Sequence, residues 1–111
     1  MTTPDEQVRP QIEAAKDYLR AEGFERVGDP PELQTRALFE RHEHVIEMWL
    51  GTQRRLLYLN LTWLDDRPAD QVSNDLNDLD VAQRLRDAPA IRLLPGEQGG
   101  TQINTDCDSP G

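Results

Sequence analysis

The segment from Arg54 to Leu64 is apolar on both of the faces that a β-strand would present. Side chains of a strand alternate between its two faces. The apolar residues are Leu57, Leu59, Leu61 and Trp63 on one face, and Leu56, Tyr58 and Leu64 on the other. A small antiparallel sheet commonly packs one face on its core and leaves the other in solvent. The chain must therefore cover both faces of this segment itself or present an apolar patch, and such a patch usually marks an interface.

The chain offers limited material for covering such a patch. It has 111 residues, of which 36% are hydrophobic, and this length fits a single domain. We expect that domain to span residues 1–95, because Gly, Gln, Asn, Asp, Ser and Pro dominate from residue 96 onward. Residues 96–111 are predicted to form a flexible tail, with a short strand through Ile103 as the less favoured alternative. Cys107 is the only cysteine, so no internal disulfide is expected.

The N-terminal part of the sequence predicts a helix from Pro4 to Glu22. Its apolar residues recur at the spacing of one helix face, namely Val8, Ile12, Ala15 and Leu19. Gly23 ends the pattern and places Phe24 where it can contact Leu19 in a Schellman motif. Pro10 removes a backbone hydrogen bond, so we expect the helix either to kink there or to begin there.

Three apolar runs then predict an antiparallel meander, at residues 33–39, 45–50 and 54–64. A helix is expected to begin at Pro68. We expect it to break near Asn77, because Asn, Asp and Ser side chains compete for backbone hydrogen bonds, and to restart from Val81 to Arg86. Residues 90–94 would add an edge strand. The predicted fold class is α+β, with an N-terminal helix, a three-stranded antiparallel β-meander and a C-terminal helical segment with a possible extra edge strand.

The charge balance bears on the kind of partner. The chain has 12 Lys and Arg against 21 Asp and Glu, a net charge of -9. Direct binding to nucleic acid or to an anionic membrane needs clustered positive charge, so neither is expected. A basic protein would be steered toward this field, although the same charge also serves solubility alone. The sequence has no signal-peptide pattern and no apolar run that could cross a bilayer, so we expect a cytoplasmic protein.

The sequence offers one weak set of metal ligands. Glu40, His42 and His44 would project from one face of a strand, and two imidazoles with a carboxylate can hold a divalent metal. Neighbouring positions on one strand surround an ion poorly, so we expect solvated turn residues and no cofactor. The acidic run from Asp75 to Asp80 lacks the central Gly and distal Glu of a calcium loop. No residue is nominated as catalytic, and no enzymatic activity is expected.

These features indicate a small non-enzymatic protein-binding module of the chaperone, immunity-protein or inhibitor type. Trp49, Leu56 and Tyr58 would anchor the contact, and self-association into a homodimer is its simplest form. Acidic residues would steer a basic partner, namely Asp65, Asp66, Asp75, Asp78 and Asp80. Two alternatives stay open. One is an acidic nucleic-acid mimic of the phage counter-defence type, which would block a nucleic-acid enzyme; the other is a small metal-dependent enzyme using His42 and His44.

Overall fold

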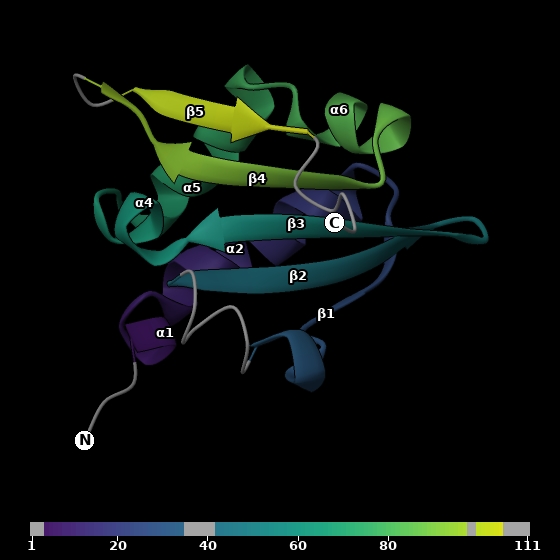
Figure 1. Ribbon diagram of the computed structural model, residues 1–111, viewed down its shortest axis with the longest axis horizontal. Coiled ribbons are helices and arrows are strands. Elements are labelled where there is room, and N and C mark those ends of the chain that lie inside the picture. The colour runs from purple at the N-terminus through teal and green to yellow at the C-terminus, as the bar shows by residue number, and fades with distance from the viewer. Residues whose placement is uncertain (1–3, 35–41, 98–99, 106–111) are drawn as a thin grey trace.

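The chain folds around a five-stranded sheet with helices packed on one of its faces (Figure 1). The computed structural model describes residues 4–34, 42–97 and 100–105. The strands are β1 (Glu25–Gly28), β2 (Glu43–Leu50), β3 (Gln53–Asn60), β4 (Ala90–Pro95) and β5 (Thr101–Asn104). The helices are α1 (Pro4–Gln7), α2 (Arg9–Ala21), α4 (Leu61–Asp65), α5 (Ala69–Asp78) and α6 (Val81–Asp87), and residues 31–34 are also helical. The α+β class is confirmed. Within the described ranges no helix is long and apolar enough to span a membrane.

The N-terminal helix divides where Pro10 predicts a discontinuity. α1 and α2 are separate helices, and Pro10 lies in the first turn of α2, where its missing N–H removes no intrahelical hydrogen bond. The end of α2 is the expected Schellman motif. Gly23 has a φ of 99°, its N–H donates to the Arg20 carbonyl at 3.1 Å, and the Phe24 N–H donates to the Leu19 carbonyl at 3.1 Å. Phe24 is buried in the core with Leu19.

β1, β2 and β3 form an antiparallel meander. β2 and β3 pair along their whole length through a two-residue turn, and Gly51 takes a φ of 67° at its first position, as a type II′ hairpin requires. The first strand of the meander is not the predicted one. Residues 33–34 are helical, and residues 35–39 lie outside the described residues. β1 instead follows α2 directly, and its single large apolar residue, Val27, leaves no alternating pattern in the sequence.

The third predicted strand ends at Asn60, because the Asn60 side chain caps a helix. Its Oδ1 accepts hydrogen bonds from the N–H of Thr62 at 2.9 Å and of Trp63 at 3.2 Å, which starts α4. The prediction of a strand through Leu64 is therefore wrong for residues 61–64. Helical spacing in α4 buries Leu61, Trp63 and Leu64 together in the core. Leu64 consequently does not belong to an exposed apolar face.

The C-terminal half breaks and restarts near the predicted position. Asp80, with a left-handed φ of 55°, separates α5 from α6. The chain then returns to the sheet as β4, which pairs with β3 in parallel and with β5 in antiparallel orientation. β4 is thus an interior strand and not the predicted edge strand. β5 is the short strand through Ile103 that the sequence left open, and it lies within the segment expected to be a tail.

One hydrophobic core lies between the sheet and the helices. Alternate residues of the three central strands point into it, namely Ile46, Met48, Leu57, Leu59, Ile91 and Leu93. The helices contribute buried residues from the other side, among them Leu19 of α2, Trp63 of α4, Leu76 of α5 and Leu85 of α6. The core therefore uses one face of the sheet.

Candidate functional site

The alternation of β2, β3 and β4 leaves a second face of the sheet, which we call the outer face. Because the core takes Ile46, Leu57 and Leu93, the intervening side chains point away from the helices. The outer face consists of Glu43, Val45, Glu47 and Trp49 from β2, Arg54, Leu56 and Tyr58 from β3, and Ala90, Arg92 and Leu94 from β4. The three anchor residues predicted from the sequence therefore share this face.

An apolar strip crosses the outer face. Val45 and Ala90 are both 0% exposed, while Trp49, Leu56 and Tyr58 are half-buried. Val45 lies opposite Tyr58 in the β2–β3 ladder, and Ala90 lies beside Leu56 in the β3–β4 ladder. We call these five residues the apolar strip.

Ion pairs flank the apolar strip. Arg54 Nε lies 2.5 Å from Glu47 Oε2, and Arg92 Nε lies 2.6 Å from Oε2 of Glu43, which is 1% exposed. The Arg92 guanidinium also lies over the Tyr58 ring, 4.8 Å from its centroid. A buried carboxylate such as that of Glu43 needs a charged partner of this kind. Among the residues of β2, β3 and β4 named above, each of the two carboxylates is therefore paired with a guanidinium, although the chain as a whole carries -9.

The acidic residues expected to steer a partner lie elsewhere. Asp65 and Asp66 are at the end of α4, Asp75 and Asp78 belong to α5, and Asp80 connects α5 to α6. α5 packs on the core side of the sheet (Figure 1). The structure thus brings the apolar anchors together and leaves the acids of α5 on the opposite side of the sheet.

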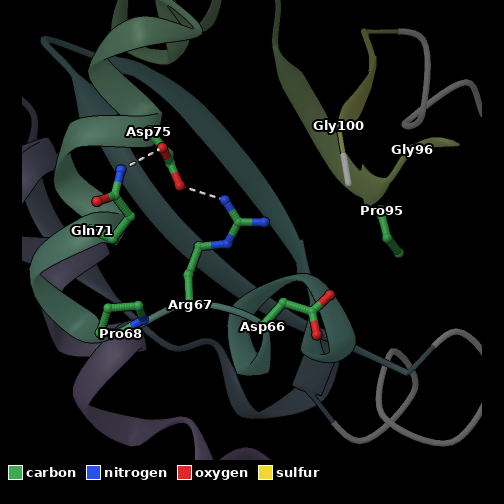
Figure 2. A pocket seen from close by; sticks show the side chains of 8 residues that line it. All are labelled: Asp66, Arg67, Pro68, Gln71, Asp75, Pro95, Gly96 and Gly100. Carbon is green, nitrogen blue, oxygen red and sulfur yellow. Dashed lines mark hydrogen bonds and ion pairs between the residues drawn. The ribbon is translucent and has the colours of Figure 1, made fainter. Parts of the chain in front are cut away.

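Two of these acids line an open hollow between the start of α5 and the β4–β5 turn (Figure 2). The hollow has a volume of about 580 Å³ and is lined by Asp66, Arg67, Pro68, Gln71, Asp75, Pro95, Gly96 and Gly100. The Arg67 guanidinium pairs with Asp75 and lies over the Trp63 ring, 3.9 Å from its centroid. Gln71 Nε2 donates to Asp75 at 2.9 Å. Asp75 is therefore engaged in internal contacts, while Asp66 is exposed.

A chain of three charged groups, two of them buried, lies at the start of β2, on the core side of the sheet. His44 Nε2 is 2.9 Å from Asp29 Oδ1, and Asp29 Oδ2 is 2.6 Å from Lys16 Nζ. Lys16 and His44 are 7% and 4% exposed. Burial acts to raise the pKa of Asp29, but hydrogen bonds from Lys16 and His44 outweigh it and hold that pKa below its ordinary value of 3.8. Sequence reasoning missed this chain, because its members come from α2, β2 and the segment after β1 and no spacing connects them.

The predicted metal candidates are not brought together. His44 directs Nε2 to Asp29, His42 is exposed and has a φ of 57°, and Glu40 lies outside the described residues. In the part of the chain that the structure describes, no three His, Cys, Asp or Glu side chains gather in a group that could hold a metal ion.

Comparisons of the chain with family models, with curated proteins and with solved structures find no match. The outer face, the hollow and the contacts of Lys16, Asp29 and His44 are the features of the described residues that bear on function.

Proposed function

We propose that the chain is a small non-enzymatic protein-binding module, and that its outer face binds a second copy of the chain. The observation that carries the proposal is the apolar strip, in which Trp49, Leu56 and Tyr58 are only half-buried. α2, α4, α5 and α6 pack against the core on the other face of the sheet (Figure 1). Partly exposed aromatic and aliphatic side chains that share one face are typical of a binding surface.

The charges of the outer face favour a second copy over a basic partner. Glu47 is paired with Arg54, and Glu43 with Arg92. In a twofold symmetric contact a surface patch meets its own copy, so a patch with excess charge would repel itself. The paired charges here reduce that repulsion at the contact itself, although each copy carries a net charge of -9. The acids of α5 lie on the other side of the sheet, away from such a contact.

The dimensions of the strip predict a reversible contact. The outer face that holds the strip has three strands about 4.8 Å apart and roughly six residues long, so at about 3.3 Å per residue it covers at most on the order of 300 Å² in projection, and Val45 and Ala90 within it are 0% exposed. A stable interface commonly buries about 800 Å² per partner. We therefore expect a weak contact that dissociates on dilution.

Sedimentation velocity over a range from low micromolar to near-millimolar concentration tests the proposal. The weight-average sedimentation coefficient of the wild type should rise with concentration. The double variant Trp49→Ser with Tyr58→Ser should remain a monomer over the same range, because it loses the aromatic anchors of the strip. Leu79→Ser is the matched control: Leu79 is a half-buried apolar residue at the end of α5, on the helical side, and its variant should associate as the wild type does.

Circular dichroism and the urea midpoint would establish that the double variant is folded. A folded double variant that associates with the affinity of the wild type would contradict the proposal, as would a wild type that stays monomeric throughout the range.

A further inference from the structure

The two edges of the sheet differ in how they are protected against pairing with another strand. β1, at one edge, pairs with β2 through a register shift between Glu25 and Gly28. Arg26 lies inside that shift with a φ of 55°, and Glu25 and Arg26 are both charged. Bulges, irregular backbone and charged side chains are the devices that keep an edge strand from pairing with other chains.

β5, at the other edge, is as short as β1, with four residues, but has neither a bulge nor a charged side chain within residues 101–104. Its sequence is Thr-Gln-Ile-Asn, without charge, proline or glycine. It pairs with β4 in an unbroken register, from Thr101 opposite Pro95 to Asn104 opposite Arg92. An unprotected regular edge is a template to which an extended chain can add as a further strand.

The register identifies the backbone groups that β5 would offer. The Gly96 N–H donates to the Gly100 carbonyl at 2.9 Å, and hydrogen-bonded pairs alternate along an antiparallel ladder. Gln102 and Asn104 therefore bond inward to β4, and Thr101 and Ile103 direct their N–H and C=O groups outward. Within the described part of the chain no backbone hydrogen bond reaches these outward groups.

Contacts on the core side hold β5 in its strand conformation. The Trp63 indole Nε1 donates to Thr101 Oγ1 at 2.8 Å, and the Ile103 side chain packs against the hydrophobic core. An edge that is already ordered loses little conformational entropy when a further strand adds to it.

Charge next to this edge indicates which kind of strand it would accept. The β4–β5 turn supplies Pro95, Gly96 and Gly100 to one side of the hollow in Figure 2, and Asp66 and Asp75 lie on the other side. These two carboxylates face one guanidinium, that of Arg67, so the lining keeps an excess of one negative charge. The chain as a whole also carries -9. The negative charge of the lining and the negative net charge of the chain both favour a positively charged segment.

We infer that the outer edge of β5 binds an extended, basic segment of a partner protein as a sixth strand, with a Lys or Arg side chain of that segment entering the hollow beside Asp66. This surface is separate from the outer face, so one copy of the chain can use both.

Amide hydrogen exchange measured by NMR on the full chain tests the inference, with a capped hexapeptide of alternating Val and Lys as the probe. In the free protein the amides of Gln102 and Asn104 should be protected, and those of Thr101 and Ile103 should exchange rapidly. At a peptide concentration of about ten times Kd, exchange at Thr101 and Ile103 should slow by about tenfold. The same peptide with an N-methyl group on every residue, which removes the N–H donors of both edges, and a Val–Glu peptide should not produce this protection.

Two variants distinguish the contribution of the hollow to peptide binding from that of the overall negative charge of the chain. Asp66→Asn should weaken binding of the Val–Lys peptide by about two- to fivefold, the range of an exposed ion pair. Asp78→Asn removes an equal charge from an exposed position on α5 that does not line the hollow, and it should have a smaller effect. Equal losses in both variants would overturn the role assigned to the hollow.

Unchanged exchange at Thr101 and Ile103 under saturating peptide would overturn the inference. Peptide-induced shifts at Trp49 and Leu56 in place of β5 would overturn it as well, while supporting the outer face as a binding surface. Failure of the outer face to associate in sedimentation would leave the result at β5 unaffected, so the two proposals fail separately.

Discussion

Replacement of Asn60 by Ala should destabilise the protein, because Asn60 starts α4 at the end of β3. Its Oδ1 accepts from two N–H groups, those of Thr62 and Trp63. Loss of an N-cap side chain costs about 0.5–2 kcal/mol. Trp63 is 0% exposed, so its released N–H is poorly placed to bond with water. We therefore expect the upper part of that range, about 1–2 kcal/mol, which corresponds to a fall in Tm of about 4–8 °C for a chain of this size.

Urea unfolding followed by circular dichroism and tryptophan fluorescence measures the effect of Asn60→Ala. The midpoint should fall while the slope of the transition stays constant, because only the stability changes. Asn60→Asp is the matched control: it keeps an acceptor at the cap and adds a negative charge at a helix N-terminus, so it should lie within about 0.5 kcal/mol of the wild type. An Ala variant as stable as the wild type would refute the reasoning, since that result is expected if β3 continued through Leu64 as a strand.

Three further substitutions test other parts of the fold. Asp29→Asn removes a carboxylate whose pKa is lowered by its contacts in the folded state. The wild type should therefore have a higher free energy of unfolding than this variant above pH 3.8, and the difference should disappear as the pH falls below that value. Thermal unfolding at several pH values measures this difference. Gly51→Ala should cost about 1 kcal/mol in urea unfolding, because its φ of 67° strains any L side chain even though no atom lies within 4 Å of the added Cβ. Trp63→Phe removes the hydrogen bond to β5 and leaves a cavity at a side chain that is 0% exposed, so it should cost about 2 kcal/mol or more and accelerate amide exchange in that strand.

The sequence predicts the fold best where the local backbone preferences and the burial of apolar side chains favour the same structure. Gly23 and Phe24 stop α2 because a left-handed glycine and a following apolar residue satisfy the helix end and the core together. Residues 61–64 were mispredicted for the opposite reason. Where every position is apolar or compatible with burial, the sequence pattern does not distinguish a strand from a short helix, and the cap by Asn60 decides between them.

The candidate surface was predictable only in part. Trp49, Leu56 and Tyr58 alternate along paired strands, so their common face follows from the register of a hairpin. Asp75 and Asp78 belong to α5, and no local sequence pattern indicates on which side of the sheet this helix packs. The Glu43–Arg92 ion pair of the outer face and the Lys16–Asp29–His44 contacts join segments that are distant in the chain, so no local sequence pattern predicts them.

The most direct test of the outer face is a ¹⁹F NMR measurement on protein labelled with 5-fluorotryptophan. The chain has two tryptophans: Trp63 is 0% exposed in the core, and Trp49 is half-buried on the outer face. If the outer face binds a second copy, the Trp49 resonance should move with protein concentration and lose its sensitivity to exchange of H₂O for D₂O, while the Trp63 resonance stays fixed. A Trp49 resonance that is unchanged from dilute to near-millimolar protein, and that keeps its full solvent sensitivity, would contradict the proposed contact.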